Sequence, residues 1–199
     1  MQTLTYLYND YTDARMVMHE LEKSGIASSN ITFVASNTDD RASISGAPTP
    51  ENSSSGAATG ATVGGVVGAG AGILTAIGAL AIPGFGPLVA AGVLATTLVT
   101  TTGGIVAGSL IGALTSYGID EEDAHVYAEG VRRGNTLISV RTADDEAEQV
   151  EALMRRHGGV AADERRKDYE KAGWSSYDPS SPAFTRDEIE RERNRNRLG

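Results

Sequence analysis

The sequence predicts an α+β domain that is interrupted by a long uncharged insert and followed by a charged tail. Three observations lead to this prediction: strand and helix patterns alternate on both sides of the insert, residues 52–119 contain no Asp, Glu, Lys or Arg, and residues 163–199 hold nine acids and nine bases. Hydrophobic periodicity separates the strand and helix segments, and changes in charge content mark the boundaries. We therefore expect five parts. They are the first half of the α/β domain (1–37), a linker (38–55), a helical hairpin (56–118), the second half of the domain (119–163) and the tail (164–199).

The first half of the domain has the pattern of a β-α-β unit. Residues 3–8 alternate threonine with leucine and tyrosine, which is typical of a half-buried strand. A helix follows Asp10 as its N-cap and ends near Gly25. Its apolar stripe has helical spacing and consists of Ala14, Val17, Met18 and Leu21. Residues 31–35 are rich in β-branched and aromatic residues and predict a second strand.

The second half supplies two more helices and two more strands. A helix capped by Asp120 runs to about Gly134, and its apolar face is formed by Ala124, Tyr127, Ala128 and Val131. Residues 136–140 predict a strand. A helix from Asp144 then turns Ala147, Val150 and Met154 inward, and residues 160–162 form a short edge strand. A four-stranded sheet covered by helices follows, in a ferredoxin-like β-α-β / α-β-α-β arrangement.

The tail is half charged, and its aromatic residues Trp174, Tyr177 and Phe184 are scattered among Ser, Pro and Asp. Such composition predicts mostly disorder, because too little apolar surface is present to offset the entropy of ordering. Residues 185–197 have the signature of a short polar helix, with Thr185 and Glu188 in capping-box positions.

The uncharged insert is predicted to be an antiparallel helical hairpin. Its turn contains two prolines and two glycines, which cannot continue a helix, and consists of Pro83, Gly84, Phe85, Gly86 and Pro87. Small residues recur every fourth position in both arms, so a helix would carry a glycine groove along one side. The predicted groove consists of Gly56, Gly60, Gly64, Gly68, Gly72, Gly92, Gly104, Gly108 and Gly112.

This glycine zipper predicts close helix packing, either in lipid or between copies of the chain. Each glycine costs about 1 kcal/mol relative to alanine inside a helix in water, so a row of them indicates a compensating contact. In lipid, small-xxx-small faces are the usual means of helix association. The alternative is a soluble homo-oligomer in which the hairpins bury one another. The expected partners are therefore a lipid bilayer, the chain itself, or both.

Composition argues against several classes of function. A net charge of −9 disfavours a nucleic-acid partner, because affinity for nucleic acid comes mainly from Lys and Arg. The chain has no cysteine, which removes disulfides and thiolate zinc sites. Glu121 and His125 have the i, i+4 spacing of a metal pair, but a surface helix start with capping acids explains the same residues and a third ligand is missing. We predict no catalytic residue, no metal, no cofactor and no small-molecule substrate.

The order and spacing of several segments resemble the bacterial general stress protein domain of the heat-induced YflT type. The resemblance covers residues 1 to about 163 and rests on the 82–87 turn, on Leu110-Ile111-Gly112-Ala113-Leu114, on 118–124 with Tyr127 and Gly130, and on the 136–141 strand after Arg132-Arg133-Gly134. It implies a stress-response accessory protein without an established reaction, whose hairpin associates with a membrane. The tail lies outside the resemblance.

Together these observations predict a non-catalytic general stress-response protein that is membrane-associated through its self-packing hairpin. The hairpin is expected in the inner membrane and the acidic α/β domain in the cytoplasm. If the hairpins bury one another instead, the protein is a cytoplasmic oligomeric interaction module. An enzyme or ligand sensor that uses Glu121, Asp123 and His125 is a third, weaker hypothesis.

Overall fold

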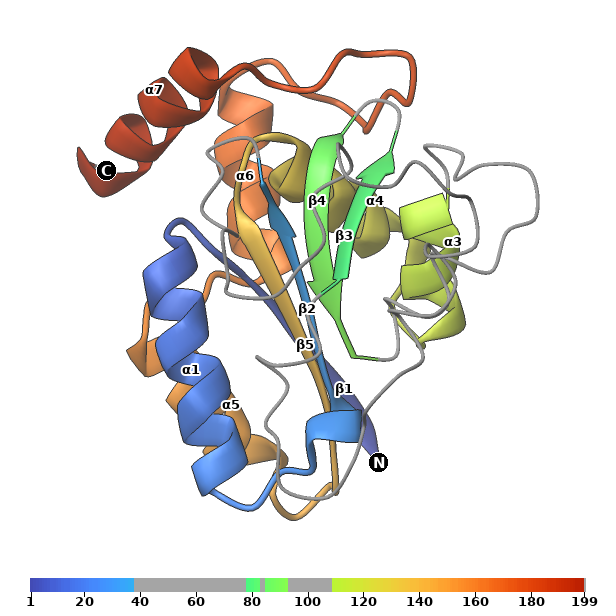
Figure 1. Cartoon of the computed structure of the whole chain (residues 1–199), viewed down its shortest axis with the longest axis vertical. Helices are drawn as coiled ribbons and strands as arrows, with labels where there is room; N and C mark the ends of the chain where they lie inside the picture. The colour runs from blue at the N-terminus through green and yellow to red at the C-terminus, as the bar shows by residue number, and fades with distance from the viewer. Residues whose placement is uncertain (38–77, 83–84, 93–108, 199) are drawn as a thin grey trace, which may run out of the picture.

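The computed structural model describes residues 1–37, 78–82, 85–92 and 109–198, which form an antiparallel sheet with helices packed on it (Figure 1). The sheet has five strands in the order β1-β5-β2-β4-β3. The strands are β1 (Gln2–Tyr8), β2 (Ile31–Ser36), β3 (Gly78–Ile82), β4 (Gly86–Ala91) and β5 (Thr136–Thr142). The helices are α1 (Tyr11–Lys23), η1 (Ser28–Asn30), α3 (Ser109–Ser116), α4 (Glu121–Arg132), α5 (Ala147–Arg156), α6 (Ala162–Lys171) and α7 (Arg186–Leu198). The predicted α+β class is confirmed.

The predicted β-α-β opening is present as β1, α1 and β2. The apolar stripe that defines α1 in the sequence is buried against the sheet, and its four residues Ala14, Val17, Met18 and Leu21 are inaccessible to solvent. β1 and β2 do not pair with each other. Each pairs antiparallel with β5, which lies between them, so β1 and β2 run in the same direction.

The second half of the domain supplies α4, the central strand β5 and α5. The α4 face predicted from the sequence is buried, although the side chain of Asp120 makes no capping hydrogen bond. The predicted edge strand at 160–162 is reduced to one bridge. There the backbone N–H groups of Leu7 and Val160 each donate to the other residue's carbonyl oxygen over 2.9 Å. The chain then continues into α6, which packs beside β1 where the predicted edge strand would have continued.

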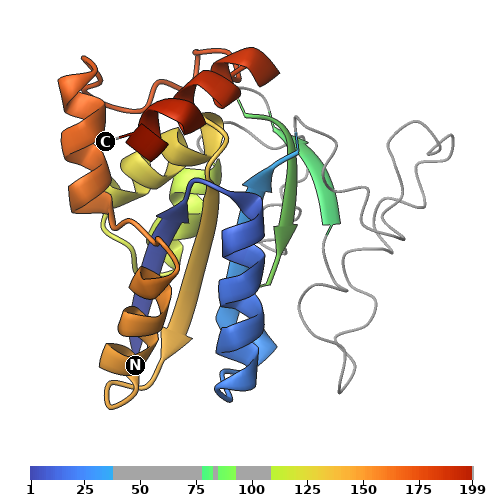
Figure 2. The ribbon, with the colours of Figure 1, turned by 90° about the vertical axis from the view of Figure 1, so that its left-hand side faces the viewer.

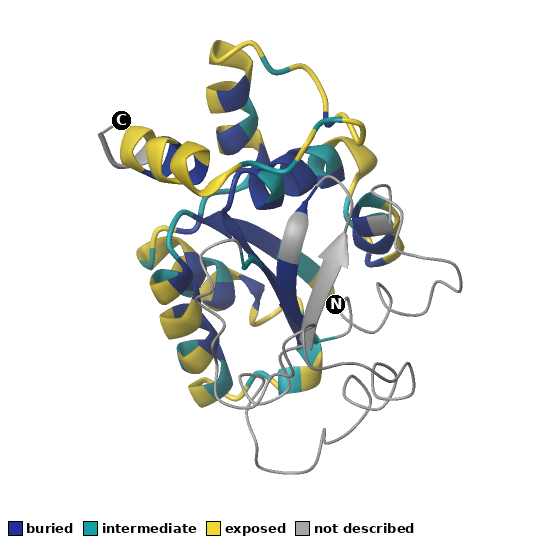
Figure 3. Ribbon diagram, turned by 45° about the horizontal axis from the view of Figure 1, so that its top comes forward, coloured by how far each residue is buried: buried dark blue, intermediate teal, exposed yellow. Residues whose placement is uncertain are grey.

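Helices cover both faces of the sheet. α1 and α5 lie side by side on one face, and α3 and α4 lie on the other (Figures 1 and 2). Because successive side chains of a strand point to opposite faces, Tyr8 and Phe33 pack under α1 and α5 while Leu7 and Val34 pack under α3 and α4. The central strands are therefore buried on both sides, whereas the helices expose their outer surfaces (Figure 3).

The predicted helical hairpin is wrong for Gly78–Ile82 and Gly86–Ala91, which form the paired antiparallel strands β3 and β4. β4 pairs with β2, and β3 pairs with β4 at the edge of the sheet. The reason is the free edge of β2, whose backbone groups require hydrogen-bond partners and find them in the uncharged run of β4. Of the predicted second arm, Ser109–Ser116 forms the helix α3. The linker 38–55 and residues 56–77, 83–84 and 93–108 lie outside the described residues.

The prediction that the tail is mostly disordered is also wrong. α6 and α7 cover one end of the sheet, and the connection between them returns over α4 (Figure 2). Tyr169, Tyr177 and Ile189 are buried, with 1–3% of their surfaces exposed. These residues are too widely spaced to give the tail an apolar face of its own, but each packs against the rest of the domain. The short helix capped by Thr185 is confirmed as α7, with Glu188 accepting the Thr185 backbone N–H at 2.8 Å.

Replacing Gly92 tests whether the insert is part of the sheet. Gly92 follows β4 with φ +86°, and an added Cβ would overlap the carbonyl oxygen of Ile31 and lie 2.9 Å from the Cα of Thr32. We predict that Gly92→Ala lowers the free energy of unfolding by about 2–5 kcal/mol, from left-handed strain and overpacking together. Urea denaturation measures this loss.

Gly118→Ala is the matched control. Gly118 also has a positive φ, +91°, but the nearest atom to an added Cβ is the Thr3 Oγ1 at 4.0 Å. The control should lose only the strain, about 1–2 kcal/mol. Equal losses in the two variants would show that β4 does not lie against β2.

Candidate functional site

The described part of the insert is built into the core of the domain. Leu88 of β4 and Leu110 and Leu114 of α3 are fully buried. They join Val34 of β2 and Tyr127 of α4 in one apolar cluster. The insert therefore supplies part of the cover of one sheet face as well as two of the strands.

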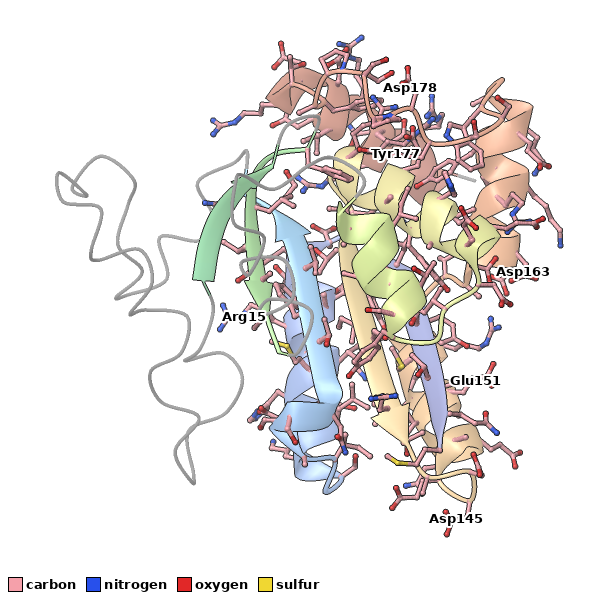
Figure 4. The ribbon with its side chains drawn as sticks, turned by 90° about the vertical axis from the view of Figure 1, so that its right-hand side faces the viewer. Arg15, Asp145, Glu151, Asp163, Tyr177 and Asp178 are labelled. Carbon is pink, nitrogen blue, oxygen red and sulfur yellow. The ribbon has the colours of Figure 1, made fainter. Side chains whose placement is uncertain are left out.

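The tail covers the turn of the insert. Phe85, which precedes β4, is 1% exposed and stacks on Tyr177 with ring centroids 5.2 Å apart and planes 19° apart. Tyr177 belongs to the connection between α6 and α7 and lies against α4, and its neighbour Asp178 lies at the surface (Figure 4). Burial raises the pKa of Tyr177 to about 12, so its phenol is neutral at physiological pH. This contact fixes the insert and the tail against each other.

The described residues of the predicted hairpin turn lie between and within two strands. Phe85 is in the turn, and Gly86 and Pro87 begin β4. Pro87 pairs with Ala81 of β3, one residue outside the register in which β4 pairs with β2. A proline can occupy a strand at a position where its missing N–H is not required by the ladder. Pro83 and Gly84 lie outside the described residues.

The two described members of the predicted glycine groove do not share a helix. Gly92 ends β4 and approaches the backbone of β2, so its placement on a helix was wrong. Gly112 lies in α3, where an added Cβ would have no atom within 4 Å. The other predicted groove residues lie outside the described part of the chain, and they are Gly56, Gly60, Gly64, Gly68, Gly72, Gly104 and Gly108.

The outer strand of the sheet carries no charge. β3 reads Gly-Ala-Leu-Ala-Ile and ends the strand order, so among the described strands it has a neighbour on one side only. Edge strands present a row of backbone donors and acceptors, and proteins commonly protect such edges with lysine, proline or a bulge. The β3 sequence contains neither lysine nor proline, and β3 pairs with β4 without a bulge. β1, at the other end of the strand order, is also uncharged, but Val160 bridges it at Leu7. Among the described strands, β3 is therefore the edge without such a bridge.

The two candidate metal ligands on α4 have different surroundings. The ring of His125 is 6.4 Å from that of Tyr177, and its Nδ1 is buried without a hydrogen-bond partner. Glu121 lies in the first turn of the same helix. No group of three His, Cys, Asp or Glu side chains suited to a metal occurs among the residues that the structure describes.

A buried ion network that the sequence analysis missed joins α4 to α7. Glu129 is fully buried and accepts hydrogen bonds from Arg132 at 2.7 Å and from Arg133 at 2.6 Å. Arg133 also donates to Glu192 of α7 at 3.2 Å, and Glu192 pairs with Arg195. The i, i+3 and i, i+4 spacing of Glu129 with the two arginines was a signal for the pairs. Nothing in that spacing indicated that the tail would bury them.

Electrostatics keep this network charged. Burial alone would lower the pKa of Arg133, but its hydrogen bond with Glu129 and the charges around it raise the pKa above the usual value. The Arg133 guanidinium also lies 4.3 Å from the ring centre of Tyr169, a cation–π contact. Burial raises the pKa of Tyr169, so this phenol stays neutral. The network therefore holds α6 and α7 on α4 through charge as well as apolar contact.

Comparison with protein-family models, with curated proteins and with solved structures finds no match to the chain. The resemblance to the YflT-type stress proteins stays a prediction. Within the described residues, no helix has both the length and the apolar character that crossing a membrane requires.

Breaking the buried network should destabilise the domain. We predict that Glu129→Gln lowers the free energy of unfolding by about 3–5 kcal/mol, because Arg132 and Arg133 lose their buried counter-ion. Glu164→Gln is the control, since Glu164 forms an exposed pair with Arg155 at 2.7 Å and should cost less than about 1 kcal/mol. Chemical denaturation at pH 7 compares them. Similar small losses for both variants would mean that α7 does not bury Glu129.

Proposed function

We propose that the protein is a non-catalytic, stress-associated interaction protein that assembles with a second copy of itself through its uncharged insert. The observation that carries the proposal is the position of β3, an uncharged strand at the edge of the sheet. The stress-associated part comes from the resemblance. The self-association part comes from the uncharged edge that β3 forms.

Two β3 strands can extend the sheet across a two-fold axis. An isologous contact places the same surface of both subunits together, and antiparallel pairing of two identical strands meets this condition. With Leu80 at the centre of β3, the pairing would place Leu80 opposite Leu80 and Ala79 opposite Ala81. Each subunit would then continue the antiparallel pattern that already joins β2, β4 and β3.

The distribution of charge along the chain also favours association through the β3 edge. The net charge of −9 opposes association of two copies over most of the surface, but residues 52–119 contribute nothing to it. Like charges placed directly opposite each other destabilise a strand pair. A self-pairing strand brings each residue type against its own kind, so an uncharged strand avoids this penalty.

The rest of the domain supports a scaffold role. The order Val160 bridge, β1, β5, β2 corresponds to a ferredoxin-like sheet whose fourth strand is shortened, with β4 and β3 added beyond β2. His157 bonds to Glu20 at 3.0 Å and so joins α5 to α1, and His125 packs on Tyr177. Both histidines thus have packing roles that account for them without catalysis.

Membrane association through the insert is a second candidate function. Residues 52–77 contain no charge and outnumber the about 20 residues that cross a bilayer core. The predicted two-helix hairpin cannot serve in its original form, because its centre forms β3 and β4. If this candidate is correct, the protein stays in the membrane pellet after a carbonate wash. Complete release into the supernatant contradicts it.

Cysteine cross-linking tests the β3 contact directly, because the chain has no cysteine of its own. Paired residues in an antiparallel ladder have Cα atoms about 4.5–5.5 Å apart, within the range that a disulfide spans. We predict that Leu80→Cys forms a disulfide-linked dimer under mild oxidation at micromolar concentration. Ser175→Cys, at an exposed position in the tail, should stay mostly monomeric.

A charge variant provides the complementary measurement. Ala79→Lys with Ala81→Lys places two positive charges on one face of β3, and these would face the same charges of the second copy. Analytical ultracentrifugation should show dimers for the wild type and monomers for this variant, while Ser175→Lys with Ser176→Lys behaves as the wild type. A monomeric wild type, or a Leu80→Cys yield no higher than that of the control, refutes the contact.

A further inference from the structure

A cavity of about 570 Å³ lies where β1 ends against α6 and α7. Its walls combine cationic, acidic and apolar side chains from segments far apart in the sequence. The residues that line it are Asn9, Val160, Arg165, Asp168, Tyr169, Lys171, Ala172, Glu192 and Arg195. The volume is within the usual range for small-molecule sites.

Arg165 is the unusual member of this lining. It is 2% exposed, and one of its terminal nitrogens donates to the Asn9 Oδ1 at 2.9 Å. Its Nε is buried without a hydrogen-bond partner. No carboxylate among the described residues forms an ion pair with it. Arg165 is therefore a buried cation that has a neutral hydrogen-bond acceptor but no counter-ion.

The nearby carboxylates already have partners. Asp168 pairs with Lys171 at 3.2 Å, and Glu192 pairs with Arg133 at 3.2 Å and with Arg195. Burying an unpaired charge costs several kcal/mol, so buried arginines are normally matched with an anion. Among the described residues that line this cavity, both acids are therefore already paired with other cations. A bound anion would complete the pairing.

We propose that this cavity binds a small phosphorylated molecule, with the phosphate against Arg165. The planar guanidinium suits phosphate because it offers parallel N–H donors. Lys171 and Arg195 lie in the same lining, where they pair with Asp168 and Glu192, so Arg165 is the cation of this lining without a carboxylate partner among the described residues. Val160, Ala172 and the Tyr169 ring supply apolar surface for the rest of the molecule. This binding site is independent of the β3 contact and does not require catalysis.

Inorganic phosphate is the probe that tests the site. In thermal unfolding of the full chain, 20 mM phosphate should raise Tm by about 3 °C or more above potassium chloride of equal ionic strength. Arg165→Met should lose this difference. Arg166→Met is the matched control, because the neighbouring Arg166 pairs with Glu122 at 3.0 Å and Asp123 at 2.6 Å, away from the cavity lining. The control should keep the wild-type response.

Asn9→Asp provides a second variant that does not remove the arginine. The new carboxylate would stand 2.9 Å from Arg165 and act as a built-in counter-ion. It should raise Tm without phosphate and abolish the phosphate response. The proposal is overturned if the wild type shows no phosphate-specific shift, if Asn9→Asp keeps the full shift, or if Arg166→Met loses the shift as completely as Arg165→Met.

Discussion

The central position of β5 constrains the rest of the molecule. β5 is hydrogen-bonded to β1 on one side and to β2 on the other, so it joins the two halves of the domain across the insert. The chain consequently leaves β2 at a free edge and must return to α4 on the face opposite α1. β4 takes the free edge of β2, and α3 leads back over the open face. The insert thus extends the sheet, and among the described strands the edge moves outward from β2 to the uncharged β3.

The two faces of the sheet are covered in different ways, and this difference explains the ordered tail. α1 and α5 arise from the two halves of the domain and cover one face with regular apolar stripes. The other face has α3 and α4, and Phe85 at its margin is covered by Tyr177 from the tail. Further along, Arg133 at the end of α4 pairs with Glu129 of α4 and with Glu192 of α7. The tail therefore orders by filling gaps on an existing surface, which a charge-rich segment can do without an apolar face of its own.

The elements that the sequence predicted correctly are those whose pattern is local. The alternation of residues 3–8 and the stripe of α1 depend on periods of two and 3.6 residues, which are visible in the sequence. The uncharged runs of β3 and β4 are too short for a period to separate strand from helix, and the free edge of β2 that decides between them is a tertiary feature. The candidate cavity shows the same limit: Arg165 and Arg166 are adjacent arginines in one charged helix, yet the first is buried against Asn9 and the second pairs with acids of α4.

An acidic chain can still hold an anion when local geometry outweighs net charge. Nucleic acid presents many phosphates at once, and a net charge of −9 on the protein disfavours binding to such a polyanion. At physiological salt the Debye length is about 8 Å, so distant surface acids act weakly on a single bound phosphate. Inside the cavity, Asp168 and Glu192 each pair with other cations. No carboxylate among the described residues pairs with the buried guanidinium of Arg165. Because charges in a buried setting are poorly screened, the local pairing at Arg165 governs what this cavity can bind.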